Sequence, residues 1–182
     1  MPSDLTSLAS KYAGVFNSQA RACEQLTIIS GPSGAGKTTW CQNAAIQAHA
    51  AVLPVAGLIS PAIFERGEKV GIAVVDLKSG ERRVLATRRP PEREGGCVWR
   101  FHSDAILWAN HCLQAVRARD ILFVDELGPL ELLHGQGFQQ GLILIDAGFY
   151  SQAFVVVRPS LLPVARSRWP GAHLLRMGNR LP

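Results

Sequence analysis

The chain contains the stretch Gly31-Pro32-Ser33-Gly34-Ala35-Gly36-Lys37-Thr38, which matches the pattern G-x-x-x-x-G-K-[ST] at every fixed position. The apolar run 26–30 precedes it and predicts a buried strand, and residues 39–48 follow as a predicted helix. In that setting the glycines let backbone N–H groups turn toward an anion, and the helix N-terminus adds partial positive charge. Residues 31–38 are therefore predicted to form a phosphate-binding loop, the P-loop.

Each position of the P-loop has an expected role if the anion is a nucleoside triphosphate such as ATP or GTP. Lys37 would reach the β- and γ-phosphates, and the Thr38 hydroxyl would hold Mg²⁺, the expected cofactor. The residues expected to contact the nucleotide are Gly31, Pro32, Ser33, Gly34, Ala35, Gly36, Lys37, Thr38 and Thr39.

An acidic pair closes a second apolar run, Leu122-Phe123-Val124-Asp125-Glu126. Nucleoside triphosphate chemistry needs a carboxylate at the C-terminal end of a parallel strand beside the P-loop, where it can hold Mg²⁺ opposite Thr38. Asp125 is predicted to fill that role as a metal ligand. Glu126 is predicted to orient the attacking water or accept its proton.

A cation is also expected near the γ-phosphoryl group, because negative charge develops on its oxygens during transfer. Arg158 and Arg100 are the preferred candidates. Arg158 follows the predicted strand 153–157, and Arg100 lies near the polar loop 88–96, a candidate mobile segment that carries further arginines: Arg88, Arg89 and Arg93.

The bulk properties favour one α/β domain. A chain of 182 residues with a net charge of +5 suits a single core, and the modest positive charge is compatible with phosphate ligands. We expect an N-terminal arm at 1–24 and one domain at 25–182, with an antiparallel meander inserted at about 62–87. No signal peptide or membrane span is visible in the sequence, so a cytoplasmic location without a membrane partner is expected.

The rest of the chain alternates predicted strands and helices. Further strands are expected at 55–60, 97–101 and 121–125, with a last edge strand at 173–177. Predicted helices cover 103–119, capped by Ser103-Asp104, then about 137–147 and 160–168.

The P-loop 31–38 is a Walker A motif, and the run 122–126 with its acidic pair is a Walker B motif. With both in place, the sequence resembles the small P-loop nucleoside-triphosphatases of archaea and thermophilic bacteria, which are related to the human cancer-related nucleoside-triphosphatase. The resemblance covers about residues 26–160. It rests on the P-loop, on segments 57–61, 64–71 and 74–81, and on the string Asp125-Glu126-Leu127-Gly128-Pro129-Leu130-Glu131-Leu132.

The resemblance implies a P-loop NTPase fold of the kinase-like type, a three-layer sandwich around a mostly parallel sheet. It also implies Mg²⁺-dependent hydrolysis of ATP, GTP and other triphosphates to diphosphate and phosphate, with loose base specificity. Lys37, Thr38, Asp125 and Glu126 take the same roles as above. The segment 95–102 replaces what in many relatives is a Gly-Lys/Arg-Tyr-containing stretch, so the resemblance leaves the role of Arg100 open.

Several alternatives stay open at the level of sequence. Glu131 is either a partner of the site or a helix cap, or else a surface residue that begins a turn. The same parts could transfer phosphate to an acceptor, with the meander and the loop 88–96 forming an acceptor site. A nucleotide-dependent switch that binds nucleic acid or a protein is less favoured, because no aromatic–basic RNA motif is present. Oligomeric state cannot be read.

Overall fold

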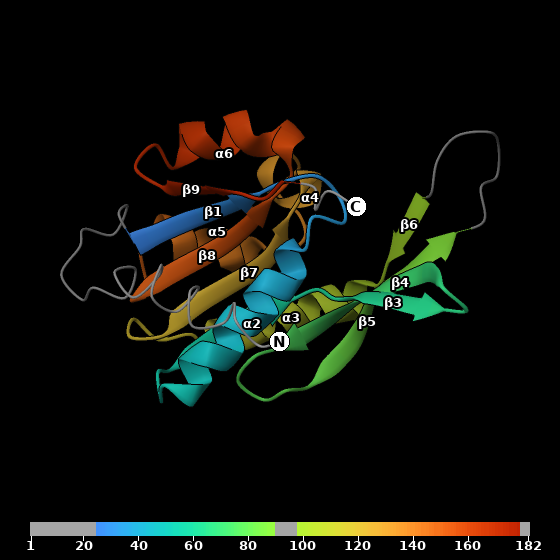
Figure 1. The fold of residues 1–182 in the computed structure, drawn as a ribbon, viewed down its shortest axis with the longest axis horizontal. Coiled ribbons are helices and arrows are strands. Elements are labelled where there is room, and N and C mark those ends of the chain that lie inside the picture. The colour runs from blue at the N-terminus through green and yellow to red at the C-terminus, as the bar shows by residue number, and fades with distance from the viewer. Residues whose placement is uncertain (1–24, 90–97, 179–182) are drawn as a thin grey trace, which may run out of the picture.

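The computed structural model describes residues 25–89 and 98–178, so the predicted arm 1–24 and all of the loop 88–96 except its first two residues lie outside it. Parallel strands form the centre of the sheet in the order β2 (Val55–Ile59), β7 (Ile121–Leu127), β8 (Gln152–Val157), β1 (Leu26–Ser30) and β9 (His173–Arg176). Among the described strands, β9 lies at one edge, as predicted (Figure 1).

An antiparallel extension continues the sheet beyond β2. It consists of β4 (Glu68–Asp76), β5 (Arg82–Arg89) and β6 (Val98–Phe101), while β3 (Ala62–Glu65) pairs with β4 off this path. Arg66 and Gly67, with φ of 49° and 83°, form the tight turn between β3 and β4. The predicted meander is therefore present, and β6 extends it beyond residue 87.

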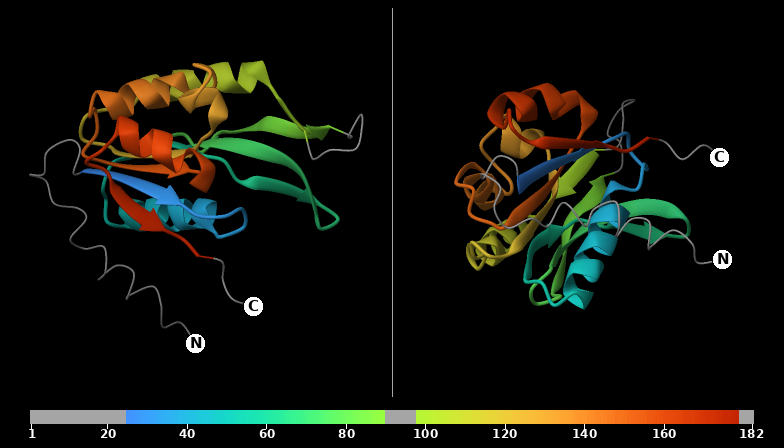
Figure 2. Two further views of the ribbon diagram at one scale, coloured as in Figure 1. Left: turned by 90° about the horizontal axis from the view of Figure 1, so that it is seen from above. Right: turned by 60° about the vertical axis from the view of Figure 1, so that its left-hand side comes forward.

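Helices cover both faces of the sheet, which gives three layers (Figure 2). On one face α2 (Lys37–Ala50) buries Cys41 and Ala45 against a cluster that includes Phe123 and Phe154. The other face carries three helices: α3 (Ser103–Gln114), α5 (Gln139–Asp146) and α6 (Leu162–Arg168). Alternate residues of each strand point to opposite faces. Ile28 therefore packs in the cluster under α3, α5 and α6, and Ile29 packs in the cluster under α2.

The helices predicted at 103–119 and 160–168 differ from the observed ones. The helix predicted at 103–119 ends at Gln114, because residues 115–120 turn back so that Asp120 can accept a hydrogen bond from the Arg117 N–H. Its N-cap is His102 rather than Ser103-Asp104, and Asp104 lies in the first turn, where its charge complements the helix dipole. Residues 160–168 form a 3₁₀ turn, η2 (Pro159–Leu161), followed by α6.

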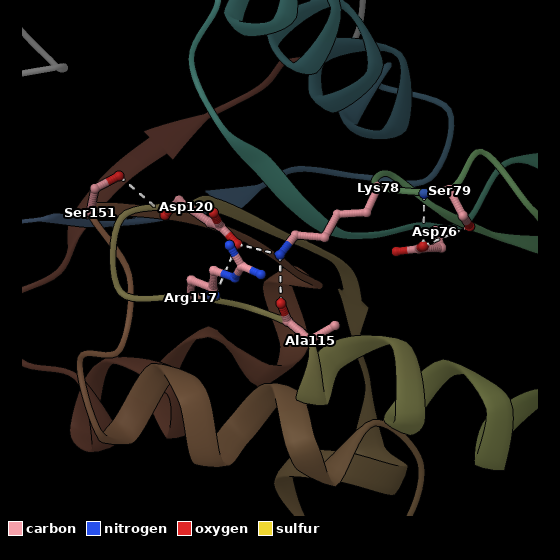
Figure 3. A network of polar contacts seen from close by, with 7 residues as sticks. All are labelled: Asp76, Lys78, Ser79, Ala115, Arg117, Asp120 and Ser151. Carbon is pink, nitrogen blue, oxygen red and sulfur yellow. Dashed lines mark hydrogen bonds and ion pairs between the residues drawn. The ribbon is translucent and has the colours of Figure 1, made fainter.

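A partly buried ionic contact ties the antiparallel extension to the parallel core (Figure 3). Lys78, in the β4–β5 turn, places its Nζ 2.6 Å from Asp120 Oδ2 and 2.5 Å from the Ala115 carbonyl oxygen. The Asp120 side chain is only 3% exposed, and its backbone carbonyl accepts hydrogen bonds from Ser151. This Lys78–Asp120 clamp lies at the end of β7 away from the P-loop. Among the described helices, none is long and apolar enough to cross a membrane.

Candidate nucleotide-binding site

The P-loop connects β1 to α2 and is organised by its own lysine. The Lys37 side chain is largely buried, and its Nζ donates hydrogen bonds of 2.7 Å to the carbonyl oxygens of both Gly31 and Pro32. Gly34 and Gly36 have φ of 79° and 85°, a left-handed conformation that favours glycine. The predicted strand–loop–helix unit is thus present, with its ammonium group held inside the loop.

Gly31 has a packing role that sequence reasoning missed. A Cβ at this position would lie 2.3 Å from the backbone oxygen of Met177, at the end of β9. The Met177 N–H donates a 2.8 Å hydrogen bond to the Ser30 oxygen, which brings the two chains together. Gly31 therefore permits the C-terminal strand to close against the start of the P-loop.

Asp125 ends up against the P-loop although its strand is not the direct neighbour of β1. One strand, β8, lies between β1 and β7. Helix α2 packs across β8, β7 and β2, and this carries its first turn over to the carboxyl end of β7. The Thr38 hydroxyl consequently donates a hydrogen bond to the Asp125 carboxylate.

The Asp125 carboxylate is almost fully buried, at 2% exposure. Burial raises its pKa from 3.8 to about 6, against the opposing effects of the Thr38 hydroxyl and the Ser60 N–H, which donates to Oδ2 over 3.2 Å. Glu126 adds to the rise by repulsion, and Lys37 counteracts it. A cation bound nearby would stabilise the ionised form of this carboxyl by compensating its charge.

Glu126 and Arg158 meet at the mouth of the site. Arg158 directly follows β8, and its Nε forms an ion pair with Glu126 Oε1. The arginine side chain is 57% exposed and the glutamate 27% exposed, so both stay accessible from the cavity. Arg100 is on β6 opposite Thr87 and is exposed, and it is not among the residues that line the cavity.

The Glu131 side chain is buried and braces the surrounding loop through hydrogen bonds. This favours the prediction that it caps a helix over the prediction that it is a surface residue at a turn. It lies in α4 (Pro129–Leu132), and its carboxylate accepts hydrogen bonds from the Gly128 N–H at 2.8 Å and the Phe138 N–H at 2.9 Å. Burial raises the pKa of this carboxyl despite those two bonds. The contacts fix the loop that follows Glu126, between β7 and α5.

A cavity of about 1200 Å³ unites these groups. Lys37 and Thr38 of the P-loop and the adjacent Thr39 line it, together with Asp125, Glu126 and Arg158. Aromatic side chains of the antiparallel extension also line it: Phe64, Trp99 and Phe101. Sequence reasoning missed these three as site residues. The usable signal was the two-residue spacing of Trp99 and Phe101, which places them on one face of a strand.

The sheet of parallel strands, the glycine loop before α2 and the Thr38–Asp125 contact define the fold of a P-loop NTPase. A family model described as NTPase matches residues 26–145, and the chain belongs to this family. The chain is 32% identical to the nucleoside-triphosphatase THEP1 of Methanopyrus kandleri over 105 residues, which is 58% of each chain. It is 26% identical over 152 residues to the THEP1 of Caldivirga maquilingensis, covering 82% of this chain and 81% of that one.

Two solved structures share the fold. The solution structure of a human cancer-related nucleoside triphosphatase superposes with a TM-score of 0.64 at 22% identity, covering 84% of this chain and 88% of the other. The crystal structure of THEP1 from the hyperthermophile Aquifex aeolicus gives a TM-score of 0.62 at 16% identity, covering 84% and 90%. The fold predicted from the sequence is therefore confirmed.

Proposed function

We propose that this protein is a Mg²⁺-dependent nucleoside triphosphatase that hydrolyses ATP, GTP and other nucleoside triphosphates to diphosphate and phosphate. The observation that carries the proposal is the buried Asp125 carboxylate, which accepts a hydrogen bond from the Thr38 hydroxyl at the P-loop end of α2. The accessible Glu126 follows it immediately in the chain. Phosphate-binding, metal-binding and water-activating groups thus share one cavity.

The donor set suits Mg²⁺. This ion prefers oxygen ligands and is commonly held by one or two carboxylates together with substrate phosphates. Asp125 and Thr38 offer a carboxylate and a hydroxyl in contact, and the described residues contain no cluster of three metal-ligating side chains that would suit a different metal. When bound, Mg²⁺ would neutralise charge on the β- and γ-phosphate oxygens.

The chain's own residues would then act on the phosphates. Lys37 would exchange the carbonyl oxygens of Gly31 and Pro32 for β- and γ-phosphate oxygens. Glu126 would hold a water in line with the γ-phosphorus and accept its proton as the bond to the bridging oxygen breaks. Arg158, already paired with Glu126, would turn toward the γ-phosphate oxygens.

Base specificity is proposed to be loose. The sequence has no Asn/Thr-Lys-x-Asp string of the kind that recognises guanine. The charged groups with proposed roles in catalysis lie at the phosphate end of the cavity: Lys37, Asp125, Glu126 and Arg158. Lys69 lies instead beside Trp99. The triphosphate therefore supplies most of the recognition.

Phosphate release from ATP, GTP, CTP and UTP, with and without Mg²⁺, tests this proposal. We expect turnover of all four only with the metal. Glu126→Gln should lower kcat roughly 100-fold or more while nucleotide binding persists, because the proton acceptor is lost. Lys37→Ala should abolish turnover. The matched control is Glu65→Gln, an exposed hairpin carboxylate outside the cavity lining, which should leave turnover unchanged. Wild-type rates in Glu126→Gln would refute the assignment of Glu126.

A further inference from the structure

The antiparallel extension presents an aromatic surface to the cavity, made by Phe64, Trp99 and Phe101 and called here the aromatic shelf. Phe64 is on β3, and the other two are on β6, where a spacing of two residues puts them on the same face. The Lys69 ammonium, on β4, lies 5.0 Å from the centre of the Trp99 ring. In Figure 1, β3, β4 and β6 project together to the right of the parallel strands.

The shelf is not explained by packing of the core. Phe64 is 64% exposed and Phe101 is 43% exposed, and neither belongs to one of the two buried clusters of the described residues. Lys69 makes no ion pair within the described part of the chain. Exposed aromatic rings grouped beside a lysine ammonium inside a cavity are typical of a ligand-binding surface.

With a triphosphate in the P-loop and Glu126 in its proposed role, the shelf would lie on the side from which the nucleophile enters. Across the sheet the order runs from β1, which leads into the P-loop, through β8 to β7, which ends in Asp125 and Glu126, and then to β2 and β4. In an in-line displacement the nucleophile enters opposite the leaving group. The nucleoside of the triphosphate is attached to the leaving side, whereas Glu126 marks the entering side. The shelf continues beyond Glu126 and so faces the entering side.

The cavity also has room for more than one small molecule. Its volume of about 1200 Å³ exceeds the roughly 300–1000 Å³ of an ordinary small-molecule site. A triphosphate in the P-loop would occupy the end formed by Lys37 and Thr38, and the shelf would remain open.

We propose that the aromatic shelf binds the base of a second molecule, a nucleoside or nucleoside monophosphate, and presents its hydroxyl as a phosphoryl acceptor in place of water. This inference rests on the proposed function, because it uses the same phosphates and the same Glu126. Stacking on Phe64, Trp99 and Phe101 holds the ring, and Lys69 contacts its carbonyl or phosphate oxygens.

The transfer step balances without a further reactant. The acceptor hydroxyl oxygen forms the new bond to the γ-phosphorus, while the bond between that phosphorus and the β,γ-bridging oxygen breaks. The nucleoside diphosphate leaves with the electron pair of that bond. The hydroxyl proton passes to the Glu126 carboxylate and then to water, as it does when water is the nucleophile.

Calorimetric titration of the full chain, loaded with Mg²⁺ and an ATP analogue with an imido β,γ-bridge, tests the binding. The probes are adenosine, guanosine, cytidine, uridine and their 5′-monophosphates. At least one should bind, and Phe64→Ala and Trp99→Ala should each weaken it tenfold or more. Leu107→Ala is the matched control, because Leu107 is 71% exposed on α3 and outside the cavity lining. Retained thermal unfolding temperatures show that each variant is folded.

Transfer is measured with γ-labelled ATP and the probe that binds. Label should appear on the probe in the wild type and only in free phosphate in Phe64→Ala. Two outcomes overturn the inference while the proposed function stands: phosphate release without binding of any probe, or binding without labelled product. A third outcome would also overturn it: Phe64→Ala raises the KM for ATP but not the KM for tripolyphosphate, which lacks a nucleoside. That result would mean that the shelf binds the base of the substrate itself. Failure of the proposed function is distinct, since the wild type would then release no phosphate.

Discussion

At the scale of single residues, the site keeps a buried carboxylate that costs stability. Asp125 has a pKa of about 6 in the folded protein and 3.8 as its ordinary value, so the native state holds its proton more tightly than the unfolded chain. The resulting stabilisation is fully present below about pH 4 and is lost as the pH rises through 6. The difference of about two between the two pKa values corresponds to about 3 kcal/mol in the free energy of unfolding. The protein therefore keeps a buried carboxylate next to Thr38 although its ionised form lowers the free energy of unfolding at neutral pH.

The first prediction concerns Asp125→Asn in the presence of a chelator. At pH 8 the variant should raise the free energy of unfolding by up to about 3 kcal/mol, because no buried charge remains, and at pH 4 the gain should be largely lost. Urea unfolding at both pH values measures this. Glu65→Gln, which alters an exposed carboxylate, should show no such difference. Equal stability of Asp125→Asn and wild type at pH 8 would contradict the effect of burial.

Glu131 and its glycine neighbours offer a second prediction. Gly135 and Gly137 have similar φ of 62° and 70°, but a Cβ on Gly137 would lie 1.9 Å from Glu131 Oε1, whereas one on Gly135 meets nothing within 4 Å. Gly135→Ala should cost about 1 kcal/mol from its left-handed backbone alone. Gly137→Ala should cost at least about 2 kcal/mol more, because it also displaces the carboxylate that accepts one buried and one partly buried hydrogen bond. Chemical denaturation of both variants gives the comparison, and equal losses would rule out the brace.

At the scale of elements, the Lys78–Asp120 clamp holds the extension on the core. Only two residue pairs join β2 to β4, Leu58 with Asp76 and Ile59 with Val75, so the ladder between the two parts of the sheet is short. The clamp adds an ionic contact from the β4–β5 turn to the residues that precede β7.

The third prediction is that Lys78→Met lowers the free energy of unfolding by about 1–3 kcal/mol. Removing the ammonium leaves the Asp120 carboxylate, 3% exposed, without its charge partner, and the partial exposure of Lys78 keeps the loss below that of a fully buried pair. Arg88→Met is the matched control: its partner Glu68 is 76% exposed, so the loss should stay below about 0.5 kcal/mol. Guanidinium unfolding curves measure both variants. Similar small losses in the two would show that the clamp is energetically neutral.

The elements of the core could be predicted from sequence because each depends on local periodicity. The P-loop unit, the parallel strands and the meander carry that signal in runs such as 121–125 and in the Arg66-Gly67 turn. Strand order carries no such signal, so the placement of β8 between β1 and β7 needed the structure. The end of α3 at Gln114 was likewise missed, since it depends on the contacts that Ala115 and Asp120 make with the distant Lys78.

The same difference applies to the candidate site. Lys37, Thr38 and Asp125 could be predicted because their chemistry fixes residue type and spacing, and the structure brings them together. The aromatic shelf could not, because its rings come together only when β3 and β6, with β4 and β5 between them, fold around one cavity. Isolated in sequence, Phe64 and Trp99 look like ordinary strand residues.

At the scale of the whole molecule, the two ends of the sheet have separate tasks. The P-loop, Asp125 and Arg158 lie at the carboxyl ends of the parallel strands, where ligands bind in open α/β sheets, and the Lys78–Asp120 clamp lies at the other end. A ligand at the first end would contact the segments that follow β1 and β8, the end of β7 and the extension through one cavity. Its binding energy is therefore available to stabilise the whole described domain.

The fourth prediction follows from that coupling. At 100 times its Kd, the imido ATP analogue with Mg²⁺ should stabilise the protein by about 2.7 kcal/mol, which raises the Tm by roughly 5–10 °C for a chain of this size. Scanning calorimetry measures the shift. A chelator should reduce it, because the Thr38–Asp125 pair would then lack its cation, and Lys37→Ala should remove it. Phe64→Ala should keep the full shift, because the shelf is separate from the phosphate end of the cavity. A shift that is insensitive to both the chelator and Lys37→Ala would place the nucleotide outside the P-loop.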